Sequence, residues 1–214
     1  GLLGRQHSDA VASFGGSPVL LDLDKKSLID QATELNKKYG IDAHSYAVDI
    51  TSEEEINNNC KEIIKHYGKI DGLINNAANN PKIEAQNKKI FSRLENFQLE
   101  QWNADITVGL TGAFLCAKYY GNAISNNADG GVIINISSDL GLIAPDQRLY
   151  EIPSNSKSEQ PVKPITYSVI KTGLIGMTRY LATYWPGQVR CNVLCPGGID
   201  TGGLPIEFID KIIT

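Results

Sequence analysis

Short apolar strands alternate with amphipathic helices along almost the whole chain, and this alternation limits its fold more than any other feature. Buried strands are predicted at 18–22, 44–50, 70–74, 131–137 and 189–195, with helices at 1–14, 26–39, 51–67, 100–124 and 165–184. Helices of this length between strands favour a parallel sheet that is covered on both faces. The 214 residues suffice for one such domain with a substantial core. We therefore predict an α/β fold with a doubly wound parallel sheet, in a single domain over residues 1–214.

Small or polar residues end every one of these predicted strands. In chain order they are Asp22, Asp49, Asn75-Asn76, Ser137-Ser138 and Pro196-Gly197. The carboxyl ends of parallel strands meet at one edge of the sheet, where such folds bind their ligands. The pattern therefore predicts a small-molecule site at this edge.

The first residues resemble part of a dinucleotide-binding turn. Gly1 and Gly4 fit the last two glycines of G-x-G-x-x-G, and Asp22 follows Gly4 by 18 residues. In dinucleotide-binding folds an acid about 20 residues after the turn binds the adenosine ribose. The pattern favours a Rossmann-type sheet and NAD over NADP, because a carboxylate repels a 2′-phosphate. Arg5 and Lys25-Lys26 are the neighbouring cations that argue the other way.

The strand that normally precedes such a turn is not in the sequence, and the last helix lacks a following strand. We therefore expect the chain to be a fragment of a longer protein. Losing a central strand leaves unpaired backbone on its two neighbours, so we also expect weak stability in isolation.

Tyr167 and Lys171 lie four residues apart, on one face of the helix predicted at 165–184. A free tyrosine has a pKa of about 10, and a fixed ammonium one turn away favours its phenolate. Such a pair is able to pass a proton to or from a substrate oxygen. A Tyr/Lys pair on a solvated helix surface is the alternative, so the assignment depends on the other motifs.

Taken in order, the motifs resemble the short-chain dehydrogenase/reductase family over nearly the whole chain. They are the partial glycine turn, Asp22, Asn75-Asn76-Ala77-Ala78 for the family's N-N-A-G, Asn135-Ile-Ser137-Ser138, Tyr167-x-x-x-Lys171, and Pro196-Gly197 with Thr201. The resemblance implies an NAD-dependent oxidoreductase that interconverts a secondary alcohol and a ketone by hydride transfer.

The resemblance also implies a role for each matching residue. Tyr167 would be the general acid/base, Ser138 would hydrogen-bond the substrate oxygen, and Lys171 would lower the tyrosine pKa and bind the nicotinamide ribose. Asp22 would bind the adenosine ribose and Asp49 the adenine edge. The full set expected at the cofactor is Gly1, Gly4, Asp22, Asp49, Ile50, Asn75, Ala77, Tyr167, Lys171, Pro196, Gly197, Ile199 and Thr201.

Gly109 departs from the family pattern. It lies in Ile106-Thr-Val-Gly109-Leu-Thr-Gly112, where family members usually have an Asn that helps to hold a water. We expect water to fill the space left by the absent Asn, so that installing Asn changes turnover by no more than about tenfold.

The 29 residues from Ser138 to Tyr167 form a longer gap than is usual in the family. Both ends of the connection at 139–164 are therefore at the reacting centre, and we predict that it forms the wall or lid of the substrate pocket. Arg148 and Tyr150 are its candidate substrate-binding residues, because they suit a polar, anionic, sugar-like substrate. The segment at 154–160 reads as a solvated linker.

Two other functions remain open from the sequence. Gly109 and the missing first strand favour a Rossmann-type binding or regulatory protein that has lost turnover. The sugar epimerase/dehydratase branch shares Tyr-x-x-x-Lys, although Asn75-Asn76-Ala77 and the short C-terminal region argue against it. Within the family, Asn79-Asn80-Pro81 and the segment 139–150 look most similar to bacterial oxidoreductases of flagellin-modification and amino-sugar pathways.

Composition excludes several classes of partner. The chain carries 20 Lys+Arg against 24 Asp+Glu, a net charge of −4, which favours neither nucleic acid nor an anionic membrane. Its four cysteines show no metal or disulfide spacing, so we predict free thiols in a reducing cytoplasm and no metal centre. The resemblance implies a small-molecule substrate and a homo-oligomer that pairs through the helices at 100–124 and 165–184.

Overall fold

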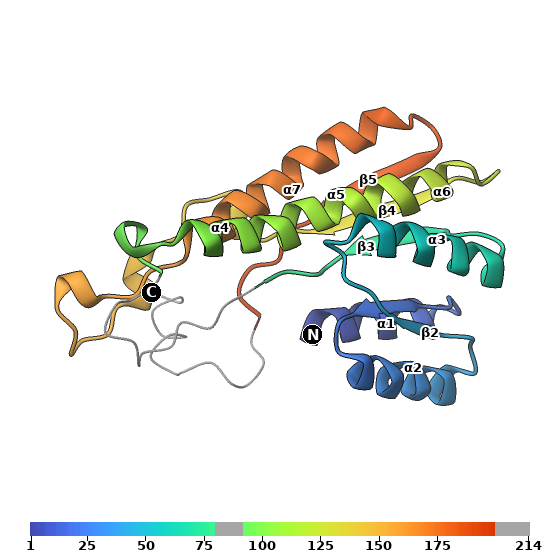
Figure 1. The fold of residues 1–214 in the computed structure, drawn as a ribbon, viewed down its shortest axis with the longest axis horizontal. Helices are drawn as coiled ribbons and strands as arrows, with labels where there is room; N and C mark the ends of the chain where they lie inside the picture. The colour runs from blue at the N-terminus through green and yellow to red at the C-terminus, as the bar shows by residue number, and fades with distance from the viewer. Residues whose placement is uncertain (80–91, 200–214) are drawn as a thin grey trace.

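The computed structural model describes residues 1–79 and 92–199. Within them the chain forms an α/β fold of parallel strands and covering helices, as predicted (Figure 1). The strands are β1 (Val19–Asp22), β2 (His44–Ala47), β3 (Gly72–Asn75), β4 (Gly131–Ile136) and β5 (Val189–Leu194). The separate helices are α1 (Leu2–Ser13), α2 (Lys25–Tyr39), α3 (Glu53–Tyr67) and α7 (Ile165–Tyr184).

One long helix runs between β3 and β4. It consists of α4 (Leu99–Ile106), α5 (Gly112–Cys116) and α6 (Asn122–Ser125), joined by π-helical turns at Thr107–Thr111 and Ala117–Gly121. The helix was predicted, but its two π turns were not. Each π turn widens the helix locally, and such turns occur often at functional sites.

The strands pair as two parallel sheets within the described residues. β1 pairs with β2, while β3, β4 and β5 form the other sheet in that order. No strand among residues 1–79 and 92–199 joins β1 to β3. The division falls where the sequence analysis expects the strand that feeds the glycine turn, so one edge of β1 and one of β3 carry no strand partner there.

Local capping explains where two of the helices begin and end. The Asp24 side chain accepts a hydrogen bond from the Ser27 main-chain N at the start of α2, and Gly40 ends this helix at a φ of 65°. At α3 the N-cap is Ser52, and its Oγ accepts from the Glu55 N.

The main core cluster lies where α3 and the long helix cover the strands. Its buried members are Val48, Ile56, Cys60, Ile63, Leu115, Cys116 and Tyr120. All four cysteines are free thiols, as predicted. Burial raises the pKa of Cys116 to about 12, so this thiol stays protonated and packs as a small apolar group.

Gly109 lies in the first π turn and packs directly against α7. A Cβ added there would come within 2.6 Å of Ile170 Cγ2. An apolar side chain therefore fills the space where we expected water. Gly112 allows a similar approach, because a Cβ there would lie 2.7 Å from Ile50 Cδ1.

The connection at 139–164 is more structured than its composition indicates. It contains the 3-10 turns Asp139–Gly141, Gln147–Tyr150 and Lys157–Glu159. The Gln160 amide accepts from the Ile152 N at 2.7 Å and donates to its carbonyl at 3.0 Å. Arg93 donates to the carbonyl of Lys157, so the supposed linker is held at its tip by hydrogen bonds.

Among residues 1–79 and 92–199, no helix has the length and apolar character that crossing a membrane requires.

The contact between Gly109 and Ile170 generates a stability prediction. Gly109→Ala should lower the free energy of unfolding by about 1–3 kcal/mol, because the new methyl group overpacks the joint between the two helices. The matched control is Gly176→Ala in α7, where an added Cβ has no neighbour within 4 Å. That variant should gain about 0.5–1 kcal/mol. Chemical denaturation measures both, and equal stabilities would contradict the packing argument.

Candidate active site

Ser138 follows β4 and is held by its neighbour Asp139. The Ser138 Oγ donates to Asp139 Oδ1 at 2.6 Å and accepts from the Leu140 N at 3.2 Å. The Asp139 main-chain N donates to the Pro196 carbonyl at 3.0 Å, which ties the ends of β4 and β5 together. The predicted serine therefore lies at the carboxyl edge of the sheet, next to the segment expected to line the cofactor.

Lys171 is buried, with 7% of its surface exposed, and its ammonium is fixed. The Nζ donates to the carbonyl of Ile136, the last residue of β4, at 2.8 Å. The Lys171 carbonyl in turn accepts from the Ser137 Oγ at 2.7 Å. Burial lowers the pKa of Lys171, and the charge of Lys163 lowers it further, while Cys195 opposes the shift. Because its ammonium is fixed, Lys171 is suited to act on a neighbouring phenol.

Tyr167 lies between two lysines. Lys163 places its Nζ 3.7 Å from the centre of the tyrosine ring, and the Lys171 Nζ lies 5.6 Å away. Lys163 belongs to the connection that precedes α7, and burial lowers its pKa while the Asp139 charge acts in the opposite direction. The close approach of Lys163 adds a second cation to the predicted Tyr/Lys pair.

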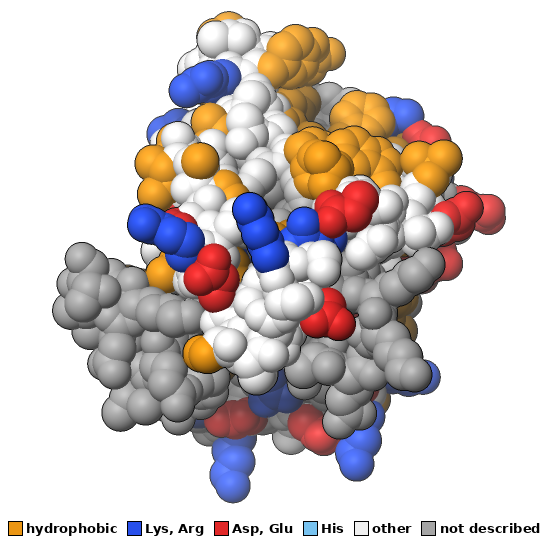
Figure 2. All heavy atoms as spheres, turned by 90° about the vertical axis from the view of Figure 1, so that its left-hand side faces the viewer, with side chains coloured by type: hydrophobic (Ala, Val, Ile, Leu, Met, Phe, Trp, Pro, Cys, Tyr) orange, Lys and Arg blue, Asp and Glu red, His pale blue; other side chains and the backbone are white. Residues whose placement is uncertain are grey.

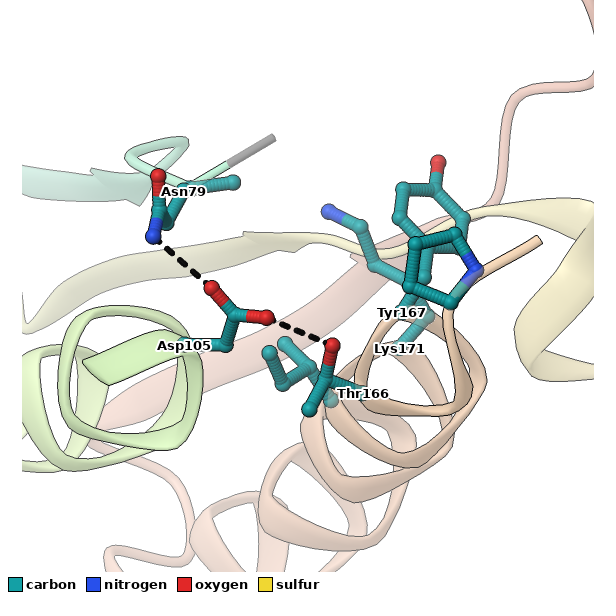
Figure 3. A pocket seen from close by; sticks show the side chains of 8 residues that line it. Asn79, Asp105, Thr166, Tyr167 and Lys171 are labelled. Carbon is teal, nitrogen blue, oxygen red and sulfur yellow. Dashed lines mark hydrogen bonds between the residues drawn. The ribbon is translucent and has the colours of Figure 1, made fainter. Parts of the chain in front are cut away.

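Tyr167 and Lys171 line a pocket with a hydrogen-bonded group centred on Asp105 (Figure 3). Asp105 is 1% exposed, and its Oδ2 accepts from the Thr166 hydroxyl at 2.6 Å. Its Oδ1 accepts from the Asn79 amide and from the Gln101 amide, each at 2.7 Å. One buried carboxylate thus joins the segment after β3, the long helix and the first turn of α7.

The sequence analysis missed Asp105, Thr166 and the contact made by Asn79. Asp105 lies one turn before Gly109, on the helix side that faces α7, and an acid on an amphipathic helix usually indicates its solvated face. The sequence signal that pointed to such a partner was Thr166, immediately before Tyr167. The polar groups in the first turn of α7 need hydrogen-bond partners from elsewhere in the chain.

At the amino end of the chain, the residues expected at the adenosine ribose lie together. The main-chain nitrogen of Gly1 is 3.8 Å from Asp22 Oδ2. A Cβ at Gly4 would lie 3.2 Å from the Asn76 Nδ2, so α1 approaches the end of β3 closely. The amino end of α1, the acid and the loop after β3 therefore share one edge, an arrangement that fits an anionic dinucleotide.

Other expected cofactor residues form contacts within the protein. Asp49 Oδ1 accepts from the Thr51 N at 2.8 Å and from its hydroxyl at 2.7 Å. The Asn75 amide donates to Asn135 Oδ1 at 2.8 Å, inside the β3–β4 pair. Ile50 packs against the main core.

Ala77, Gly197 and Ile199 are exposed at the ends of β3 and β5, and Pro196 is half-buried. Thr201 lies outside the described residues.

The connection at 139–164 brings Tyr150 to the site. Burial raises the pKa of Tyr150, and the charges of Tyr167 and Asp139 add to the shift. The side chain of Arg148 is 83% exposed, and its guanidinium forms an ion pair with Asp146. Tyr150 therefore interacts electrostatically with Tyr167, while Arg148 is mostly exposed and paired with Asp146. Positive and negative side chains are interspersed on the molecular face shown in Figure 2.

Comparison with known proteins identifies the family. A family model described as enoyl-(acyl carrier protein) reductase matches residues 3–206. A 3-oxoacyl-(acyl-carrier-protein) reductase FabG from Aquifex aeolicus is 31% identical over 202 residues, which cover 93% of this chain and 70% of the relative. The chain belongs to the short-chain dehydrogenase/reductase family. This family membership places it among oxidoreductases.

Other relatives carry names of sugar-alcohol enzymes. An NADP-dependent mannitol dehydrogenase from Aureobasidium melanogenum is 28% identical, over 98% of this chain and 69% of the relative. One from Alternaria alternata is 32% identical, over 80% of this chain and 55% of the relative. The chain therefore spans between about half and two thirds of the length of these two relatives.

Solved structures agree on the fold. The structure titled gox2181 matches with a TM-score of 0.80 and 24% identity, covering 99% of this chain and 74% of that one. An NAD+-bound xylitol dehydrogenase matches with a TM-score of 0.75 and 22% identity, covering 98% and 70%. These similarities confirm the predicted Rossmann-type architecture of this short-chain dehydrogenase/reductase.

The Asp105 group predicts a measurable loss of stability. Asp105→Asn keeps the shape of the side chain but replaces one acceptor by a donor that faces another donor. We expect the free energy of unfolding to fall by about 1.5–3 kcal/mol, the range for hydrogen bonds to charged groups. Thr166→Val removes one hydroxyl and should cost less, and both effects appear in denaturant melts. An Asp105→Asn variant as stable as the parent would show that the carboxylate is dispensable.

Proposed function

We propose that this chain carries the active site of a nicotinamide-dependent oxidoreductase that interconverts a secondary alcohol and a ketone. The observation that carries the proposal is the common pocket of Tyr167 and Lys171, with the ammonium anchored on the last carbonyl of β4. A Rossmann-type binding protein that has lost turnover would not require a buried ammonium fixed beside an accessible tyrosine. A sugar epimerase or dehydratase would share this pair, but neither is among the names of the relatives and solved structures compared above.

In this proposal each catalytic side chain has one task. Tyr167 transfers the proton at the substrate oxygen, and Lys171 holds the positive charge that favours the phenolate state of its partner. Ser138 orients the same oxygen by a hydrogen bond. Its hydroxyl now donates to Asp139, so it has to turn from that carboxylate to the substrate. A bound nicotinamide dinucleotide would accept or supply the hydride.

The preferred cofactor in this proposal is NAD. The carboxylate of Asp22 lies at the end of β1 beside Gly1, the residue before α1, where it would accept hydrogen bonds from ribose hydroxyls. Both cofactors occur among the similar proteins. The mannitol dehydrogenases are named as NADP-dependent, and the xylitol dehydrogenase structure is NAD+-bound. Arg5 is weaker evidence for NADP binding than its position indicates, because its guanidinium already donates hydrogen bonds to the side chains of Gln31 and Ser27.

The proposed substrate is polar and carries an anionic group. Lys163 is a partly buried ammonium that lies against the ring of Tyr167. Its main-chain N donates to the Gln147 side chain at 2.8 Å, which joins the segment before α7 to the 3-10 turn at Gln147–Tyr150. We therefore assign the contact with the anionic group of the substrate to Lys163, whereas the sequence analysis gave it to Arg148. Tyr150 stays a second pocket residue.

A cytoplasmic location and assembly into homo-oligomers stay predictions. The faces of α5 and α7 support the assembly, because Phe114, Val169, Tyr180 and Tyr184 are exposed there. Two copies that paired through these helices would bury these apolar side chains. The closer resemblance to flagellin-modification oxidoreductases also stays a prediction.

The role of Tyr167 is tested by Tyr167→Phe. Removing the hydroxyl leaves the ring in place, so cofactor binding should persist while turnover of a reactive polyol or ketone falls by at least about a thousandfold, within the usual worth of acid/base catalysis. Tyr180→Phe, on the exposed side of α7, should leave turnover unchanged. Near-normal turnover of Tyr167→Phe would refute the assignment.

Cofactor choice is tested by titrating the chain with NADH and NADPH and following cofactor fluorescence. We expect NADH to bind more tightly, and Asp22→Asn to narrow the difference, because the substitution removes the charge that repels a 2′-phosphate. Asp9→Asn serves as the control, because this carboxylate pairs with Lys38 and Tyr39 of α2 rather than with residues expected at the cofactor. Tighter binding of NADPH by the parent chain would count against NAD.

The contact assigned to Lys163 is tested by Lys163→Met, which keeps the length of the side chain without its charge. For an acidic sugar substrate we expect KM to rise at least about tenfold, or 1.4 kcal/mol, with a smaller change in kcat. For a neutral polyol KM should change little. Arg148→Ala should leave both values near those of the parent, and the reverse pattern would return the role to Arg148.

A further inference from the structure

A second group of chemically active side chains lies outside the catalytic pocket. Asp42 is in the turn that precedes β2, His44 is the first residue of that strand, and His66 is in the last turn of α3. The candidate active site follows the carboxyl ends of β3 and β4, whereas His44 is at the amino end of its strand. The proposed oxidoreductase activity uses none of these three residues.

The three side chains converge on the Asp42 carboxylate. The His44 Nε2 lies 3.1 Å from Asp42 Oδ1, and the His66 Nε2 lies 2.9 Å from Oδ2. One ligand atom from each residue lies within 4.8 Å of the other two. Zinc binds imidazole nitrogen and carboxylate oxygen at about 2.0–2.2 Å, which places neighbouring ligand atoms roughly 3–3.5 Å apart. Small side-chain rotations would therefore suffice to enclose an ion.

Charge at this position favours a cation. The Asp42 carboxylate lies within hydrogen-bond distance of both imidazoles and brings an acidic group to the centre of the cluster. His66 also lies at the carboxyl end of α3, where the helix dipole carries partial negative charge.

The surroundings hold the ligands in place. The Tyr67 hydroxyl donates to the main-chain carbonyl of Asp42 at 2.6 Å. Its ring meets both imidazoles edge-on, at centroid distances of 5.7 Å to His44 and 4.5 Å to His66. The two imidazoles lie 4.1 Å apart. Supporting contacts of this kind orient metal ligands and reduce the ordering that binding requires.

We propose that Asp42, His44 and His66 form a binding site for one divalent transition-metal ion, with Zn2+ as the ion to test. Two imidazoles and a carboxylate match the ligand preference of zinc better than that of magnesium or calcium, which prefer oxygen. The three residues are partly exposed, so water completes the coordination and the ion enters from solvent. The bound ion cross-links the start of β2 to the end of α3 and stabilises this edge of the fold.

The test uses the 214-residue chain after treatment with a chelator. Calorimetric titration with ZnCl2 should give one ion per chain, and the melting temperature should rise with zinc concentration, because the ion binds only the folded site. His44→Ala, His66→Ala and Asp42→Asn should each weaken the affinity at least tenfold. His7→Gln alters the remaining histidine of the chain and should keep the parent affinity. MgCl2 at the same concentrations should leave the melting temperature unchanged.

Several results would overturn the proposal. They are the absence of a zinc-dependent rise in melting temperature, a parent-like zinc affinity in both histidine variants, and an equal response to magnesium. The second result would place the ion on side chains other than the two histidines, and the third would indicate diffuse attraction to acidic side chains. If a histidine variant fails to fold, Asp42→Asn decides, because the amide keeps the size of the side chain and removes the charge that binds the ion.

Discussion

The hydrogen bond from the buried Lys171 ammonium to the Ile136 carbonyl is the contact on which the catalytic arrangement depends. It joins α7 to the end of β4, and the bond from Ser137 to the Lys171 carbonyl repeats the connection in the other direction. Tyr167 is one turn before Lys171, and Ser138 is two residues after Ile136. This pair of bonds therefore sets how closely the proposed acid/base and the proposed hydroxyl donor approach one another. A buried lysine without such an acceptor would be strongly destabilising.

A second buried charge supports the same helix from the other side. The Asp105 carboxylate receives three side-chain hydrogen bonds, and one of them comes from Thr166 in the first turn of α7. Gly109, one turn further along the long helix, lets that helix approach Ile170 closely. Gly109 belongs to the π turn at Thr107–Thr111, which follows Asp105 and adjusts the register of the helix. The tyrosine helix is therefore located by polar contacts at its first turn and by tight apolar packing one turn later.

Local patterns in the sequence were sufficient for much of the fold. The predicted boundaries of α7 agree with those observed at Ile165 and Tyr184, and strands were found in all the predicted regions. Hydrophobic periodicity and the helix-ending glycines are local signals, so they survive whatever the rest of the chain does. The segment at 154–160 is mostly exposed, as predicted, but hydrogen bonds hold it in place. Arg93 donates to the carbonyl of Lys157 and the Gln160 side chain donates to the carbonyl of Asn155, and no local pattern indicates these contacts.

By itself, the sequence determined the class of the fold and indicated Ser138, Tyr167 and Lys171 as candidate site residues at the carboxyl edge of the sheet. The fold class follows from the alternation of strands and helices, and the roles proposed for the three residues follow from the family resemblance. Only the tertiary structure decided that Asp105 is buried under α7, that Lys163 rather than Arg148 lies against the tyrosine ring, and that His44 and His66 meet at Asp42. The Asp105 and His66 contacts join segments far apart in the sequence, and Lys163 lies before the start of α7, so its spacing of four from Tyr167 carries no helical signal. Their energies depend on burial and on partners that folding alone brings together.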